Sequence, residues 1–295
     1  MSPVIEVQGL SVRYGDREAV KGLDLRVEPG RCHALFGLNG AGKTTTLKAL
    51  LGLLPVSAGT VRLFGLDPAV QEAAVKQRLA WVPDAPGVYP WMSVRDALDY
   101  AASFRPRWDR ELEAELLSTF DLDPAAPARG LSKGQRTQLG LIAAVAADVD
   151  LLVLDEPTSG LDPLVRRQFI EAIIGAFQAR RPGERTLLLS THLISEFEGV
   201  VDEFTVIHQG RAVLRAEADE ARGRYRRIRA SFEGLAPVEV PVSTLRPARR
   251  GARSLELLVS GGEAEARRWL ASAGATGVEV EALTLEEIFL SVATR

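Results

Sequence analysis

The sequence is poor in several features, and each shortage excludes a class of protein. A single cysteine, Cys32, excludes an intramolecular disulfide and is compatible with a reducing compartment. No uncharged apolar run approaches the roughly 20 residues that cross a bilayer. The longest, Leu139 to Ala147, is much shorter and contains Gly140. Residues 1–6 lack a basic region and an apolar core, so we expect no secretory signal peptide. If the protein works at a membrane, another polypeptide should supply the membrane part.

The chain also lacks an excess of charge of one sign. Its formal net charge of -3 offers no general attraction to nucleic acid or to an anionic membrane. Hydrophobic residues make up 46% and charged residues 25%, which is typical of a soluble protein with an ordinary core. The 295 residues suffice for one large domain, or for one domain with a smaller companion.

One glycine-rich stretch, Gly37 to Thr45, matches the phosphate-loop pattern G-x-x-x-x-G-K-[ST]. The glycines of such a loop let backbone N–H groups approach a polyphosphate. A short apolar strand at 31–36 precedes the loop and a helix at about 43–51 follows it, as a phosphate loop requires. Lys43 would reach the terminal phosphates, and Thr44 would help to hold Mg²⁺. The alternative is a glycine turn that merely links strand to helix. Such a turn would not need every residue of the phosphate-loop pattern.

A second apolar strand, at 150–154, ends in two carboxylates. A continuous apolar run suits a parallel strand that is buried on both faces, and ligands collect at the carboxyl ends of such strands. We expect Asp155 to hold Mg²⁺ opposite Thr44, and Glu156 to polarise an attacking water as a general base. A third apolar strand, at 186–191, ends at His192, which could donate a hydrogen bond to the terminal phosphate.

The chain before and between these strands divides into a β layer and a helical insert. Alternating strands at 4–7, 10–14 and 23–27 form an antiparallel layer, in which Tyr14 either stacks on a purine or packs on the sheet. Residues 93–120 are helical, with Ser93 as the N-cap, and a further helix opens at Ser132.

The loop at 84–92 is rich in Pro and Gly but carries Val88, Tyr89, Trp91 and Met92. Such a loop either docks a partner or covers the adjacent helices.

The composition changes near Arg222, where the sequence becomes basic with interleaved Tyr225 and Ile228. A nucleic-acid patch is one interpretation. We favour an edge strand with a solvated Arg face, because acidic residues are interspersed through the tail. A helix at about 263–272 and the segments 254–259, 277–281 and 285–292 suggest a small α+β module.

Taken in order, the phosphate loop, the Leu131–Gln135 stretch, the acidic strand end and His192 resemble an ATP-binding cassette (ABC) transporter ATPase. The ending Leu283 to Leu290 looks like the C-terminal segment of bacterial ABC ATPases of the exporter type. The resemblance of the ordered motifs covers about residues 3 to 215. It implies an α/β phosphate-loop NTPase fold with a mixed sheet core, an antiparallel β subdomain and a helical subdomain at about 85–147. The ABC domain would span 1–215 and a C-terminal accessory domain 216–295.

The resemblance also implies roles for individual residues. ATP and Mg²⁺ would be the cofactors, Glu156 the catalytic base, His192 the phosphate switch and Tyr14 the stacking partner of adenine. Such proteins act as head-to-tail dimers, so Ser132, Gly134 and Gln135 would complete the partner's ATP site and Asp162 would lie at the dimer contact. The phosphates would be held by Gly37, Leu38, Asn39, Gly40, Ala41, Gly42, Lys43, Thr44 and Thr45.

Two positions depart from the family pattern. Lys133 stands in the signature where many members carry Gly, and Asp84 stands where the coupling loop usually has Gln. A carboxylate at 84 can ligate Mg²⁺ or position water, but it adds negative charge and donates no hydrogen bond unless protonated.

The leading interpretation is the ATPase subunit of a bacterial ABC transporter, more an exporter than an importer, at the inner face of the cell membrane. Its partners would be integral membrane permease subunits and a second ABC ATPase, either identical or different, with no nucleic acid. A soluble ABC ATPase that acts on nucleic acid or ribosomes is the alternative, and the single cassette and the absence of a basic excess argue against it. A regulatory module with little turnover is a third reading, which the intact Glu156 and His192 disfavour.

Overall fold

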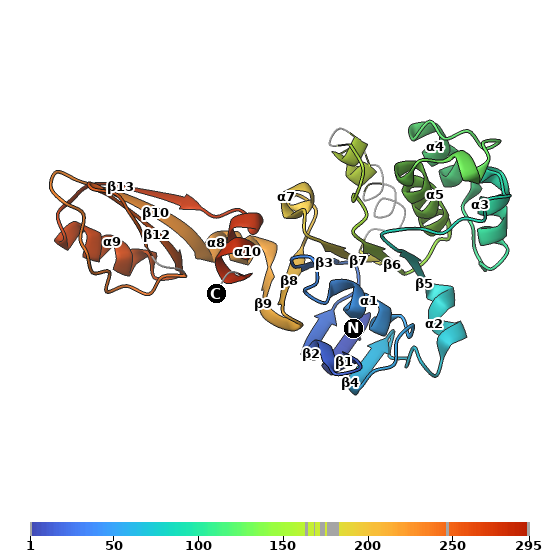
Figure 1. Ribbon diagram of the computed structural model, residues 1–295, viewed down its shortest axis with the longest axis horizontal. Helices are drawn as coiled ribbons and strands as arrows, with labels where there is room; N and C mark the ends of the chain where they lie inside the picture. Colours follow the sequence, from blue (N-terminus) through green and yellow to red (C-terminus); the bar gives the residue numbers. More distant parts are fainter. Residues whose placement is uncertain are drawn as a thin grey trace. The chain divides into compact units, whose positions relative to one another are not determined.

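The structure is a computed structural model that describes residues 2–162, 165–167, 169–171, 175, 183–245 and 248–293. The chain divides into two compact units, Met1–Ala212 and Val213–Arg295 (Figure 1). The sequence also predicts a helix that follows the turn at 158–162 and runs to about Gln178, and most of it falls outside the described residues. No helix among the described residues is long and apolar enough to span a membrane.

An antiparallel sheet begins the first unit, as the alternating pattern predicts. Its strands lie in the order β2-β1-β4 and comprise β1 (Ile5–Tyr14), β2 (Arg17–Val27) and β4 (Ala58–Leu63). The sequence suggests two separate strands before Gly15, but the structure joins them into one. A register shift between Val7 and Leu10 marks the joint, where Gly9 has a positive φ of 59°. A β-bulge therefore replaces the expected break.

A mixed sheet forms the centre of the first unit, with the strand order β5-β6-β7-β3-β8-β9. The first five strands in this order pair in parallel, and β9 returns through the turn at Gln209 and Gly210. The strands are β3 (Cys32–Phe36), β5 (Leu79–Val82), β6 (Leu151–Asp155), β7 (Thr186–Thr191), β8 (Glu203–His208) and β9 (Arg211–Glu217). Phe36 pairs with Thr191, and Asp155 with Ser190. The three sequence segments that we expect to bind ligand therefore leave the same edge of the sheet.

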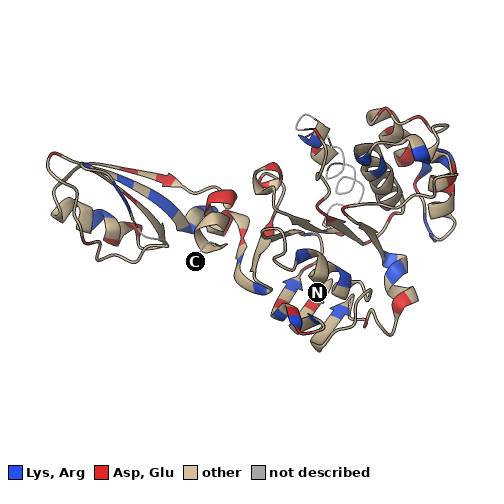
Figure 2. Ribbon diagram, viewed as in Figure 1, with Lys and Arg blue, Asp and Glu red and all other residues tan. Residues whose placement is uncertain are grey.

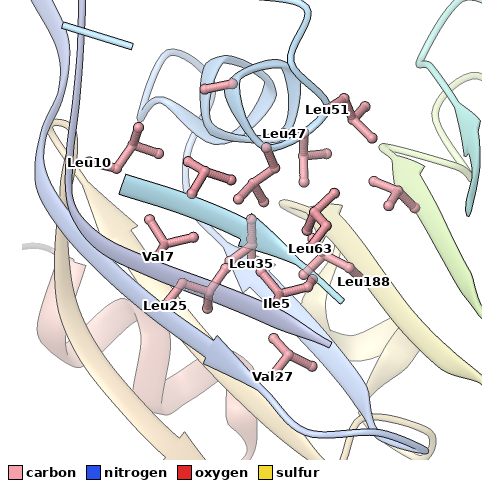
Figure 3. Close-up of a cluster of buried hydrophobic side chains, with 14 of the residues drawn as sticks. Ile5, Val7, Leu10, Leu25, Val27, Leu35, Leu47, Leu51, Leu63 and Leu188 are labelled. Atoms are coloured by element: carbon pink, nitrogen blue, oxygen red, sulfur yellow. The ribbon is translucent and has the colours of Figure 1, made fainter. Parts of the chain in front are cut away.

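The main core of the first unit lies between these two sheets and helix α1 (Lys43–Leu50). Figure 3 shows Val7 and Leu25 of the antiparallel sheet facing Leu35 of the central sheet, with Leu47 of α1 beside them. All four side chains are buried. Cys32 is also fully buried, and burial, with the charge of Asp202, raises the pKa of its thiol. This agrees with a packed rather than a reactive cysteine.

Helices pack next to β5, at one end of the strand order of the central sheet. Ser93 caps α3 with a reciprocal pair of hydrogen bonds to Asp96, which confirms the expected helix start. The carboxylate of Glu113 is buried and accepts hydrogen bonds from Arg95, Trp108 and Arg110, so it ties this helical region together. The helices of the first unit are α2 (Glu72–Arg78), α3 (Val94–Ala102), α4 (Arg110–Thr119), the 3₁₀ turn η1 (Ala128–Gly130), α5 (Lys133–Ala146) and α7 (Ile194–Phe197).

The second unit is an α+β module built on an antiparallel sheet in the order β11-β12-β10-β13. Its own core packs around the buried Ile228, Leu257 and Leu270. The strands are β10 (Tyr225–Phe232), β11 (Arg249–Arg250), β12 (Ser254–Ser260) and β13 (Ala275–Ala282), and the helices are α8 (Ala218–Arg224), α9 (Glu263–Ser272) and α10 (Leu285–Ala293).

The expectation of a basic edge strand is wrong for β10. This strand pairs with β12 on one side and with β13 on the other, so it is central. Its arginine face is not simply solvated either, because Arg227 forms ion pairs with Glu256, Glu281 and Glu287, and its side chain is only 17% exposed. Basic positions along β10 are visible in Figure 2. The arginines are balanced by carboxylates that lie up to 60 residues away in sequence.

The Arg227–Glu287 pair should stabilise the second unit at neutral pH and lose this effect at acidic pH. Burial raises the pKa of Glu287, but hydrogen bonds from Arg227 and from the Thr284 amide outweigh burial, so the pKa lies below its ordinary value. The stabilisation is therefore present above the ordinary glutamate pKa of about 4.3 and is lost as the pH falls through the lower folded-state value. We expect Glu287→Gln to lower the free energy of unfolding by about 1–2 kcal/mol at pH 7.

Chemical denaturation of the full chain at several pH values would measure this difference, which should shrink toward pH 3. Glu286→Gln is the matched control, because Glu286 lies in the same first turn of α10 and its side chain is exposed. Equal losses in the two variants would show that the effect belongs to the helix N-terminus and not to Arg227.

Candidate functional site

The phosphate loop connects β3 to α1, and its glycines occupy positions that other residues do not fit. Gly40 and Gly42 have positive φ values of 79° and 110°. A Cβ on Gly37 would lie 2.8 Å from the Ile207 carbonyl oxygen, and one on Gly42 would lie 2.7 Å from that of Ala19. The loop is therefore a cradle of backbone atoms, whose space would be filled if the glycines carried side chains. The N-terminus of an eight-residue helix follows the loop. This geometry fits a bound polyphosphate.

Lys43 begins α1 and turns back toward the loop. Its Nζ donates to the Gly37 carbonyl oxygen at 2.8 Å and lies 2.9 Å from Glu156 Oε1. The side chain is only 5% exposed. A nearly buried ammonium group needs an anion beside it, and a phosphate in the cradle would be a second one.

Asp155 ends β6 beside the loop. Its Oδ1 accepts hydrogen bonds from the hydroxyl of Thr44, at 3.1 Å, and from that of Ser190 at the end of β7. Burial raises the pKa of Asp155 and the charge of Glu156 adds to this, while the two hydroxyls and Lys43 oppose it. The structure thus brings together the Thr44 and Asp155 oxygens that the sequence predicts as Mg²⁺ ligands. Hydroxyl and carboxylate oxygens are suitable ligands for that ion.

Glu156 and His192 form a pair on the same edge of the sheet. His192 Nδ1 lies 2.8 Å from Glu156 Oε2, and the other carboxylate oxygen faces Lys43. Glu156 has a positive φ of 49°, an uncommon conformation for a residue with a side chain. Its amide donates to the Ser190 carbonyl oxygen at 2.9 Å, which helps to hold this conformation. Backbone strain of this kind is typical of functional positions.

Lys43, Thr44, Glu156 and the loop glycines Gly40 and Gly42 line a cavity of about 480 Å³, a size typical of sites for small ligands. Tyr14 lies at its wall with half of its surface exposed, so it is available for stacking. Asp84 also lines the cavity. The complete lining is Tyr14, Arg17, Ala19, Asn39, Gly40, Gly42, Lys43, Thr44, Thr45, Asp84 and Glu156.

Several predicted site residues do not line this cavity, namely Gly37, Leu38, Ala41, Asp155, His192, Ser132, Gly134 and Gln135. Ser132, Gly134 and Gln135 lie at the start of α5, where Ser132 Oγ accepts from the Gln135 amide and Gln135 Oε1 accepts from the Ser132 amide. This capping box confirms the predicted helix start. Asp162 also lies outside the cavity lining and is exposed.

Two residues of the site, Ser190 and Arg17, carry no specific signal of function in the sequence. Ser190 supports Asp155, and the only signal for it is its place at the polar end of an apolar strand. Arg17 lines the cavity next to Tyr14, but an exposed arginine after a turn carries no distinguishing pattern. Both are recognisable once the register of the strands is known.

The fold and the cavity define a phosphate-loop nucleotide-binding domain, and comparisons with known proteins give the family. The profile of the ABC transporter family matches residues 20–159. Nod factor export ATP-binding protein I of Ralstonia nicotianae is 35% identical over 227 residues, which cover 74% of this chain and 68% of the relative. Daunorubicin resistance ATP-binding protein DrrA3 of Streptomyces coeruleorubidus is 34% identical over 226 residues, covering 74% and 69%.

A solved structure described as the ATP binding subunit of an ABC transporter superposes with a TM-score of 0.67 at 28% identity, covering 75% of this chain and 92% of that one. The chain therefore belongs to the family of ABC transporter ATP-binding proteins, whose members bind nucleotide and hydrolyse ATP in step with transport. The predicted fold class and family are confirmed.

Proposed function

We propose that this chain hydrolyses ATP to drive transport, in the direction of export, through separate membrane permease subunits of a bacterial ABC transporter. The observation that carries the proposal is the convergence of Lys43, Glu156 and His192 at the phosphate cradle. The direction is supported by the names of the relatives, which refer to export and to drug resistance.

Each residue at the cradle would have its own role in ATP hydrolysis. Tyr14 would stack on the base, while the loop amides and Lys43 would hold the phosphates. Glu156 would take a proton from the attacking water, and His192, held at the Glu156 carboxylate, would reach the terminal phosphate. Both residues lie at the strand edge that faces the cradle.

Thr44 and Asp155, with Asp84 in the cavity lining, would supply oxygen ligands for Mg²⁺. When bound, this ion would neutralise charge on the phosphates. Among the described residues, no group of three or more His, Cys, Asp and Glu side chains could hold a metal ion by itself. Phosphate oxygens and water would therefore supply the remaining ligands.

We further propose that two such domains share their ATP sites. Ser132 and Gly134 lie outside the chain's own cavity, and both are at the start of α5, where free amides can face an anion from another chain. Gln135 would fix the cap and Asp162 would lie in the contact. The second domain can be a copy of this chain or a different ABC ATPase.

The membrane partner would dock on an aromatic patch of the first unit, which we define as Tyr89, Trp91, Tyr100 and Phe104. Neighbouring rings lie 4.7, 5.9 and 5.0 Å apart, so the patch is contiguous. Trp91 is 76% exposed and Phe104 65% exposed, so these rings are not used to cover helices. Phe104 also lines a mostly apolar groove of about 630 Å³ that runs to Leu51 and Trp81. An apolar patch beside a groove suits an amphipathic cytoplasmic helix of a permease.

This arrangement would place the protein at the cytoplasmic face of the cell membrane. Affinity purification of the tagged chain from solubilised membranes would test the function. We expect an integral membrane protein, and no nucleic acid, to co-purify and to raise ATP turnover. Recovery with nucleic acid or ribosomes instead would favour the alternative function.

Trp91→Ala should weaken binding of that membrane subunit by at least about tenfold, because an exposed aromatic anchor contributes roughly 2 kcal/mol or more when it is buried in an interface. ATP binding by the isolated chain should be unchanged. Leu235→Ala is the control, because Leu235 is 80% exposed in the other unit. Wild-type affinity in the Trp91 variant would rule out this docking surface.

A further inference from the structure

Lys133, at the start of α5, makes contacts that neither the phosphate cradle nor the helix cap explains. Its Nζ lies 3.2 Å from Asp84 Oδ1 and 3.3 Å from Ser159 Oγ. Asp84 belongs to the loop after β5, and Ser159 to the turn after β6. One ammonium group therefore joins the start of α5 to a segment 49 residues before it and to one 26 residues after it in sequence.

The start of α5 also packs closely on the turn after β6. A Cβ on Gly134 would lie 2.9 Å from Leu161 Cδ2, and one on Gly160 would lie 3.2 Å from Lys133 Cδ. Gly160 has a positive φ of 79°, which suits glycine. The stem of Lys133 thus lies along the glycine of this turn, and its charge is directed toward Asp84.

Each charge of this pair is unfavourable where it stands alone. Lys133 is the first residue of α5, where the helix dipole disfavours a cation, and the first turn contains no acidic residue. Asp84 lines the cavity that we assign to a polyphosphate, where an unpaired carboxylate would repel the ligand. Pairing them relieves both conflicts.

We propose that Lys133 is a positioning residue that holds Asp84 at the wall of the nucleotide cavity and fixes the loop after β5 to the start of α5. This proposal rests on the assignment of ATP to the cavity. If Ser132 and Gly134 serve the partner's nucleotide, then Lys133 links them to the chain's own nucleotide site. The two ATP sites of a dimer would be coupled through one salt bridge in each chain.

Hydrogen exchange of the nucleotide-free chain would test the link directly. We expect Lys133→Met and Asp84→Asn each to speed amide exchange of residues 83–92 about two- to fivefold, because both partners are 49% exposed and such a pair contributes modestly. The double variant should exchange no faster than either single variant, because the same link is removed. Lys133→Arg and the exchanged pair Asp84→Lys with Lys133→Asp should both restore slow exchange.

Lys76→Met is the control, since Lys76 is exposed to the same degree, 49%, and pairs with Glu72 on α2. Exchange of residues 83–92 that is unchanged in Lys133→Met, or additive effects of the two single variants, would overturn the proposal.

Nucleotide affinity gives a second readout that a merely structural contact would not move. With Mg²⁺ removed by EDTA, a fluorescent ATP analogue should bind Lys133→Met about threefold or more weakly than it binds wild type, and should bind Lys133→Arg normally. Equal affinity of Lys133→Met and wild type would contradict the role of Lys133 at the cavity. Failure of wild type to bind the analogue even with Mg²⁺ present would instead refute the proposed function, whatever the exchange data show.

Discussion

Replacing Glu156 with Gln should reduce ATP turnover by about 100- to 10,000-fold while nucleotide binding is retained. The amide keeps the size of the side chain and can still face Lys43 and His192, which contact the two carboxylate oxygens at 2.9 and 2.8 Å. It cannot accept a proton from water at neutral pH, so the general base is lost. A phosphate-release assay with the purified chain, and with its membrane partner, would measure the change.

The same variant should accumulate as an ATP-bound dimer in gel filtration with ATP and Mg²⁺, because the shared nucleotides are no longer hydrolysed. Glu72→Gln on the exposed surface of α2 is the control and should leave turnover unchanged. Turnover of the Glu156 variant within tenfold of wild type would assign the base elsewhere. Failure of both proteins to dimerise would show that the permease is needed for assembly.

Replacing Lys43 with Ala should weaken ATP binding by about 10- to 100-fold, which corresponds to the loss of a hydrogen-bonded charge. The substitution removes the cation at the cradle and also leaves Glu156 Oε1 without its nearest positive charge. Two effects therefore act in the same direction, because the uncompensated carboxylate would repel the phosphates.

Calorimetric titration with ATP would measure the Lys43 effect. Lys48→Ala makes the same chemical change in the last turn of the same helix, away from the cavity lining, and should bind ATP as wild type does. Normal affinity in the Lys43 variant would contradict the assignment of the cradle. Equal losses in both variants would point to a general weakening of α1.

Local sequence predicted the elements that position the site. The phosphate loop, the strand that ends at Asp155 and the strand before His192 each carry a short-range signal, and parallel strands in one sheet must bring their carboxyl ends together. The capped helix starts at Ser93 and Ser132 were predicted for the same reason, because the caps are made by residues three positions apart.

The contacts that could not be predicted are those between residues that lie far apart in sequence. The arginines of β10 were read as a solvated edge because Glu256, Glu281 and Glu287 cannot be assigned to them without the pairing of the strands. The contact of Lys133 with Asp84 was missed for a similar reason. Both residues depart from the family pattern, but nothing in the local sequence shows that they meet.

The cavity walls come from segments around residues 14–19, 39–45, 84 and 156, so one nucleotide would contact four parts of the chain at once. A ligand that binds only the folded state adds its binding free energy to stability, which amounts to about 2.7 kcal/mol at 100 times its dissociation constant. The ATP concentration in the cell would therefore also affect how long a molecule of this protein stays folded. At a lower ATP concentration this stabilisation would shrink, and a larger fraction of molecules would be open to proteases.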